Sequence, residues 1–177
     1  AVDMLTVSHG AAPAAGLRRI SGGVTAAKGF RAGGLSAGIK RSRKPDIALV
    51  VADAPAAAAA VFTRNQVQAA PVLISRKRVA AGVAQAVLIN SGCANCMTGR
   101  VGLEDAKRLG REAAALLHIP EKRILVASTG IIGRRLPLPR MLRAIHKLAK
   151  SVSRANHAAA AAAILTTDLL PKEAAFE

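Results

Sequence analysis

A threonine and a glycine, Thr129 and Gly130, stand together in the segment ASTGIIG, directly after an apolar run. A glycine amide carries no side chain that would block the approach of a substrate oxygen. A hydroxyl beside a backbone N–H can form an oxyanion hole, in which each donor contributes about 3 kcal/mol to stabilising the developing charge. The spacing alone favours the simpler interpretation, a turn that ends a strand. Both interpretations stay open at this point.

Two further polar segments could take part in chemistry. Thr166–Lys172 (TTDLLPK) places two hydroxyls and a carboxylate at the end of an expected helix, although this segment could also be a simple helix exit before a proline. Asn90–Gly99 (NSGCANCMTG) is a polar turn after an apolar run, and it contains the pair Cys93 and Cys96. A structural zinc needs four ligands, and no second pair follows at finger spacing. We therefore interpret the two cysteines as packed thiols, with a redox pair as the open alternative.

The charge of the chain suggests a partner of opposite sign. Lys and Arg number 26 against 10 acidic residues, which gives a formal net charge of +16. Such an excess is typical of proteins that bind polyanions. However, the chain has no Trp or Tyr for base stacking, and the Gly-rich segment Gly29–Lys40 contains neither GxxxxGK[ST] nor GxGxxG. An acidic partner chain explains the charge better, and a basic polyanion-binding module remains the alternative.

The elements that must position these segments alternate between strand and helix. The apolar runs predict strands at these positions: Asp46–Ala52, Ala59–Thr63, Pro71–Ser75, Ala86–Asn90 and Arg123–Ala127. Helical spacing of apolar residues predicts helices at Leu103–Leu117 and Pro139–Ser153. The Ala-rich Asn156–Leu165 is expected to be a third helix, and Arg76–Ala81 could form a short one. The Gly-rich Ile20–Lys44 predicts turns that join short strands, and Ser128–Pro139 predicts a loop. This alternation is typical of an α/β fold.

The bulk composition sets limits on the class of protein. A chain of 177 residues suits one domain, and its hydrophobic content of 51% includes only three Phe. We expect a flexible tail over residues 1–17 and one domain over residues 18–177. No secretory signal and no apolar run of about 18 residues is found. Two cysteines make no disulfide framework. We therefore expect a cytoplasmic protein, or one of an organelle matrix in a eukaryote.

Taken together and in order, the segments of this chain resemble the ornithine acetyltransferase (glutamate N-acetyltransferase) family. The resemblance runs from about Ile20 to Ala175. It is carried by these segments: GFRAGGLSAGIK (Gly29–Lys40), DIALVVAD (Asp46–Asp53), VFTRNQVQAAPV (Val61–Val72), NSGCANCMTG (Asn90–Gly99), GLEDA (Gly102–Ala106), STGIIGRRLP (Ser128–Pro137) and TTDLLPKEA (Thr166–Ala174). So many fragments in one order indicate common descent rather than coincidence.

The resemblance implies a mechanism and a set of roles. In that family a precursor cleaves itself at an Ala–Thr bond, and the freed Thr begins a second, beta chain. This Thr takes an acetyl group from N-acetylornithine and passes it to glutamate. An N-terminal Thr can serve as its own base, because an α-amine titrates near pH 8. By position in the motifs, Thr129 and Gly130 would form the oxyanion hole, and Thr166 would bind substrate.

The resemblance also implies an assembly. We expect a layered, αββα-like sandwich of mixed sheets and helices that a second chain completes, and a heterotetramer of two alpha and two beta chains. The sequence stops at Glu177, before the family's Lys-Gly-Ser-Gly stretch and its cleavage site, so the nucleophile is expected on the partner. We expect no metal and no cofactor, with acetyl-CoA as a conceivable co-substrate. A self-cleaving amidohydrolase of related fold is a further alternative.

Overall fold

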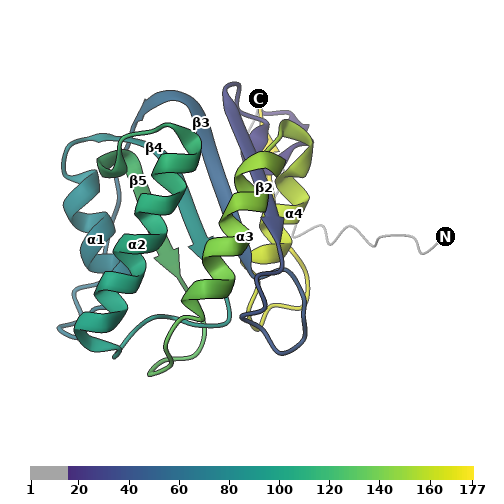
Figure 1. The fold of residues 1–177 in the computed structure, drawn as a ribbon. Helices are drawn as coiled ribbons and strands as arrows, with labels where there is room; N and C mark the ends of the chain where they lie inside the picture. The colour runs from purple at the N-terminus through teal and green to yellow at the C-terminus, as the bar shows by residue number, and fades with distance from the viewer. Residues whose placement is uncertain (1–15) are drawn as a thin grey trace.

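A four-stranded mixed sheet organises the chain (Figure 1). The structure is a computed structural model that describes residues 16–177. Its strands lie in the order β2 (Phe30–Leu35), β3 (Ile47–Ala57), β4 (Val83–Asn90) and β5 (Ile124–Ser128). The pairs β2–β3 and β3–β4 are antiparallel, whereas β4 pairs with β5 in parallel. The parallel pair requires a long crossover connection, which here contains the helix α2 (Gly99–Leu117).

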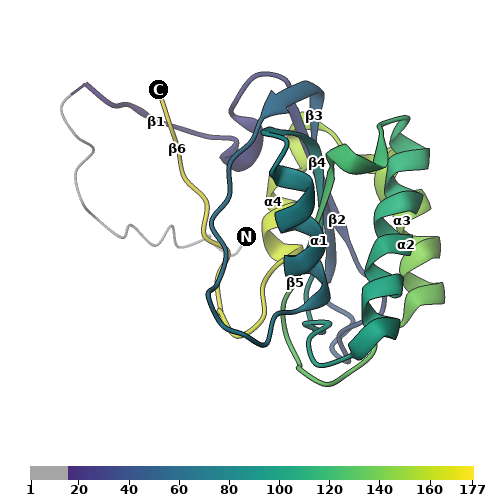
Figure 2. The ribbon, with the colours of Figure 1, turned by 90° about the vertical axis from the view of Figure 1, so that its left-hand side faces the viewer.

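Helices cover both faces of this sheet. The helices α2 and α3 (Leu138–Ser151) lie side by side over one face, whereas α4 (His157–Ala163) packs against β2 and β3 on the other (Figure 2). The helix α1 (Ala70–Val79) packs mainly against β5, at the edge of the sheet. Short β1 (Arg19–Ile20) and β6 (Ala175–Phe176) pair with each other. Single 3-10 turns fill three connections: Gly23–Thr25, Glu121–Arg123 and Arg154–Asn156.

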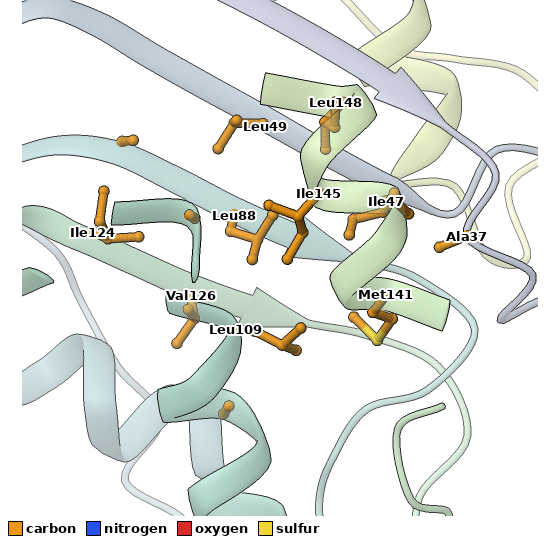
Figure 3. Packing of buried hydrophobic residues seen from close by; sticks show 14 of the residues in the cluster. Ala37, Ile47, Leu49, Leu88, Leu109, Ile124, Val126, Met141, Ile145 and Leu148 are labelled. Atoms are coloured by element: carbon orange, nitrogen blue, oxygen red, sulfur yellow. The ribbon is translucent and has the colours of Figure 1, made fainter. Parts of the chain in front are cut away.

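The main core is aliphatic, as the shortage of aromatic residues predicts. Inward-facing side chains of the strands meet the apolar stripes of α2 and α3 (Figure 3). Ile47, Leu49 and Ile124 from the sheet are fully buried, as are Ile145 and Leu148 from α3. Branched aliphatic side chains of this kind interlock in few rotamers, so a dense core forms without large rings.

On the opposite face the packing depends on small side chains. Ala32 and Ala48 of the sheet meet Ala160 and Ala163 of α4. A Cβ atom on Gly34 would lie 2.1 Å from the carbonyl oxygen of Ala159. The helix α4 therefore approaches β2 at backbone distance, which requires glycine at this position.

The free edge of β5 is covered by side chains of α1. The Ser75 hydroxyl donates to the Val126 carbonyl (2.7 Å) and accepts from the Val126 N–H (2.9 Å). The Arg78 guanidinium donates to the Ile124 carbonyl (2.7 Å) and pairs with Glu121. Burial lowers the pKa of Arg78, against the opposing effect of the Glu121 carboxylate. These contacts satisfy backbone groups that would otherwise be available for pairing with another strand.

The structure confirms the predicted α/β class but corrects two predicted strands. The Pro71–Ser75 strand is wrong, because these residues form the first turns of α1, whose Pro lies at N1 or N2. The first N–H groups of a helix have no partner within the helix, so a proline, which has no N–H, loses nothing there. Its fixed φ also suits the start of a helix. The Ala59–Thr63 strand is also wrong. No strand of the described residues pairs with it, and Val61 is 99% exposed.

The other predicted elements exist with shifted boundaries. The predicted short helix Arg76–Ala81 is the second half of α1, and α2 begins four residues before the predicted Leu103. The strand β3 continues to Ala57, and the Gly-rich segment contains β2. The predicted tail, residues 1–17, lies almost wholly outside the described residues. Within residues 16–177, none of the helices has the length and apolarity that a membrane span needs.

Candidate functional site

Three loops gather at one end of the sheet. Leu35 at the end of β2 pairs with Ile47, Ile47 pairs with Asn90, and Asn90 pairs with Ser128 at the end of β5. This register brings together the β2–β3 loop, the loop after β4 and the loop after β5, at the lower end of the sheet in Figure 1. The predicted polar turns Asn90–Gly99 and Ser128–Pro137 are therefore neighbours.

Asn90 connects the loops that follow β4 and β5. Its side chain is buried, and its amide nitrogen donates to the Cys93 carbonyl (2.8 Å). Its amide oxygen accepts from the Ser128 hydroxyl (2.6 Å), and its backbone carbonyl accepts from the Thr129 N–H (3.0 Å). Three hydrogen bonds from one buried residue fix the start of the turn that contains Thr129 and Gly130. The sequence signals this role only by a polar residue at the end of an apolar strand.

Gly130 lies directly against the neighbouring loop. Its φ is +124°, and a Cβ atom there would be 2.5 Å from the carbonyl carbon of Gly92. One residue further on, the Ile131 carbonyl accepts from the Ala94 N–H (3.0 Å). The backbone conformation and the close approach both require glycine at position 130.

Thr129 and Gly130 present two donors on the surface at this end. Both residues are exposed. Within residues 16–177, neither the Thr129 hydroxyl nor the Gly130 N–H has a protein acceptor, whereas the Thr129 N–H is bonded to Asn90. Two available donors on adjacent residues of a fixed turn can bind one oxygen atom that gains negative charge.

The segment that contains Thr166 begins at the same end of the sheet. The helix α4 ends at Ala163, whose carbonyl accepts from the buried Ser91 hydroxyl (2.6 Å). Ser91 precedes Gly92, so this bond ties the end of α4 to the loop against which Gly130 packs. Thr166 follows three residues later and is exposed. The three predicted site residues thus belong to segments that meet at one end of the sheet, while their predicted roles stay predictions.

Lys40 is a cation in this region that the site prediction did not include. Its stem covers Gly92, where a Cβ atom would lie 3.0 Å from the Lys40 Cγ, and its ammonium donates to the Pro45 carbonyl (2.8 Å). Burial lowers the pKa of Lys40 more than the neighbouring Asp46 carboxylate raises it. The side chain therefore lies partly out of water, beside the loop that holds the candidate donors.

The cysteines of the CxxC pair are both free thiols. Cys93 is buried and its sulfur contacts the Arg134 carbonyl (3.1 Å), while Cys96 is partly buried. This arrangement agrees with the prediction of packed thiols. Among the described residues, no three His, Cys, Asp or Glu side chains lie close enough together to hold a metal ion.

The fold and this turn together define an α/β protein that presents a hydroxyl and a glycine amide on adjacent residues of one exposed turn. The chain matches the ArgJ family over residues 31–177. It is 48% identical over 161 residues to the arginine biosynthesis bifunctional protein ArgJ of Thermosynechococcus vestitus, covering 90% of this chain and 38% of that protein. A chloroplastic ArgJ protein of Physcomitrium patens is 45% identical over 163 residues, covering 90% of this chain and 31% of that protein.

Two solved structures of ornithine acetyltransferase and ArgJ proteins also match this chain. The ornithine acetyltransferase of Mycobacterium tuberculosis, solved in complex with ornithine, matches with a TM-score of 0.87 and 41% identity, over 90% of this chain and 88% of that one. The ArgJ protein of Bacillus halodurans matches with a TM-score of 0.80 and 40% identity, over 87% of this chain and 81% of that one. The chain belongs to the ArgJ family, and the resemblance found in the sequence is confirmed. The chain spans 38–39% of the length of the ArgJ proteins of Thermosynechococcus vestitus and Synechococcus.

Proposed function

We propose that this chain is the alpha part of an acetyltransferase that moves an acetyl group from N-acetylornithine to glutamate. The observation that carries the proposal is the donor pair of Thr129 and Gly130, which is exposed and held by Asn90 and Gly92. The names of the relatives, which refer to arginine biosynthesis and ornithine acetyltransferase, supply the substrate class. The family relationship favours this activity over the amidohydrolase and polyanion-binding alternatives.

In the proposed reaction the nucleophile is a threonine at the start of a second chain. Its hydroxyl attacks the acetyl carbonyl, and the electron pair of the C=O bond moves to the oxygen. The Thr129 hydroxyl and the Gly130 N–H bind this oxygen. The α-amine of the threonine takes the proton from its hydroxyl. When the oxygen returns its electron pair to the carbonyl, the C–N bond breaks, the nitrogen of ornithine takes that proton from the α-amine, and the acetyl group remains as an ester on the nucleophile. Glutamate then attacks the ester through its amino group, and the same two donors bind the oxygen again. The ester C–O bond breaks, and the threonine oxygen takes the proton that the attacking nitrogen loses, which restores the nucleophile.

The proposed partner is a beta chain from the same precursor. Two observations support it. The chain covers 88% of one solved chain but 38% of a full-length relative. In addition, the outward-facing apolar side chains Val87, Ile89 and Leu125 are only partly buried, because α4 covers mainly β2 and β3. A second sheet that packs on this face would complete the αββα-like sandwich. We propose a heterotetramer of two alpha and two beta chains, located in the cytoplasm or in an organelle matrix.

Substitution of Thr129 in the complete two-chain enzyme tests the proposal. Loss of one oxyanion donor typically lowers kcat by about 10²–10³ with little change in binding. We expect this loss for Thr129→Ala and for the isosteric Thr129→Val, whereas Thr129→Ser keeps the hydroxyl and much of the activity. Ornithine release and acetyl transfer to glutamate are to be followed separately, with acetyl-CoA as a second donor. Near-normal turnover of Thr129→Val in both half-reactions would show that the turn is only structural.

A further inference from the structure

The carboxylate of Asp46 organises the loop between β2 and β3. The residue is 0% exposed, and its two carboxylate oxygens accept three backbone N–H groups. These come from Ala37 (2.6 Å), Ile39 (2.6 Å) and Lys40 (2.9 Å). A buried carboxylate is stable only when its lone pairs are satisfied, and here the loop itself supplies the donors. The path of residues 36–46 therefore depends on this one side chain.

The organised loop packs against the loop that follows β4. The Asp46 carbonyl accepts from the Ser91 N–H (2.9 Å). A Cβ atom on Gly92 would lie 3.0 Å from the Lys40 Cγ and 3.2 Å from the Ile39 Cγ2. Two of the three residues whose N–H groups bind the Asp46 carboxylate, Ile39 and Lys40, thus also cover Gly92 with their side chains.

Gly92 is also the residue against which Gly130 packs. A Cβ atom on Gly130 would be 2.5 Å from the Gly92 carbonyl carbon and 2.7 Å from the Cys93 nitrogen. Gly92 therefore lies between the loop that Asp46 organises and the turn that presents the candidate donors. A displacement of residues 39–40 would remove the side chains that pack on Gly92. Gly92 could then shift, and Gly130, which packs against it, would shift as well.

We propose that Asp46 is a positioning residue of the oxyanion hole, acting through Ile39 and Lys40 on Gly92 and hence on Gly130. This inference depends on the proposed function. An oxyanion hole needs its donors at 2.7–3.1 Å from the position of the charged oxygen, so a small displacement removes most of their effect. A misplacement of about 1 Å can lower the rate by about 10²-fold. Asp46 touches neither the substrate nor the reacting atoms.

The test is a double-mutant cycle in the complete two-chain enzyme. Asp46→Asn keeps the shape but replaces an acceptor oxygen with an NH₂ group that faces backbone N–H donors. We expect kcat to fall about 10- to 100-fold, with KM within about twofold. If Asp46 holds the turn that carries both donors, its substitution can misplace only the Gly130 N–H once Thr129 is an alanine. In the Thr129→Ala background, Asp46→Asn should therefore lower kcat by a smaller factor than in the unsubstituted enzyme, so that the two effects are less than additive.

Ser75→Ala is the matched control. It also removes a buried hydrogen-bonding side chain, but Ser75 contacts β5 from α1 and does not touch the three loops. A stability defect alone lowers the active fraction equally in both backgrounds, so the control should show additive effects. Lys40→Ala is a second variant in case Asp46→Asn fails to fold, because it keeps the backbone donor and removes the stem over Gly92. It should show the same kcat loss and the same coupling to Thr129.

The outcomes separate the two proposals. Additive effects for both Asp46→Asn and Lys40→Ala, or unchanged kcat for both, would overturn the positioning role while leaving the proposed function in place. Normal half-reactions for Thr129→Ala would instead overturn the oxyanion proposal, and the positioning inference with it. A kcat loss that is coupled to Thr129, with KM unchanged, supports both.

Discussion

At the residue scale, substitution of Thr166 tests whether this residue contributes to substrate binding or to turnover. Its exposed hydroxyl follows α4, at the end of the sheet where Thr129 and Gly130 lie. If it holds the amino-acid part of the substrate, Thr166→Ala should raise KM more than it lowers kcat, because the contact exists before and during the reaction. Thr166→Ser keeps the hydroxyl and should be mild. Unchanged kinetics in both variants would make Thr166 a helix-exit residue, and steady-state assays of each half-reaction decide between these outcomes.

The residues of the site differ in how visible they are in the sequence. Thr129 and Gly130 are adjacent and follow an apolar run, so local pattern is enough to select them. The contacts of Asn90 with Ser128, and of Gly92 with Gly130, join residues 38 positions apart. Such contacts depend on the parallel register of β4 and β5, which no local pattern determines. The supporting residues were therefore missed, whereas the two candidate donors could be selected from the sequence, and their role stays a prediction.

At the element scale, the edge contact of Ser75 should have a measurable effect on stability. Ser75→Ala would leave both the N–H and the carbonyl of Val126 without a protein partner in a buried position. An unsatisfied buried polar group costs about 1–3 kcal/mol. We therefore expect Ser75→Ala to lower the free energy of unfolding by about this amount in urea or thermal unfolding of the complete enzyme. The exposed Ser42→Ala is the control, and equal stabilities of the two variants would contradict the edge role.

The elements themselves were predicted best where the apolar pattern is long. The helices α2 and α3 were found because each shows a sustained apolar stripe, and β4 and β5 because their apolar runs end in polar turns. The run after Pro71 is only three apolar residues long, and such a run fits a strand and a buried helix segment equally well. Ala70 and Ile74 are both buried in the core, and this favours the helix α1 over a strand. The local sequence does not show this tertiary contact.

At the scale of the whole molecule, the formal net charge of +16 should produce salt-sensitive but unselective binding to nucleic acid. Contacts between Lys or Arg and phosphate release counterions, so affinity falls steeply as salt rises. In the complete enzyme an acidic partner chain would offset part of this charge, so we expect micromolar or weaker binding to unrelated DNA and RNA sequences, measured by fluorescence anisotropy between about 50 and about 200 mM salt. Sequence-selective, nanomolar binding at physiological salt would instead make polyanion recognition the main function.

The carboxylate of Asp46 has a consequence for solvent exchange. Loop amides normally exchange their protons quickly, because they open without the loss of a helix or a strand. The N–H groups of Ala37, Ile39 and Lys40 lie in a loop, yet all three donate to a carboxylate that is closed off from water. These amides should therefore exchange as slowly as those of β3, while the adjacent Arg41 and Ser42 exchange quickly. Deuterium uptake resolved by residue would reveal this short protected stretch, and Asp46→Asn should abolish it.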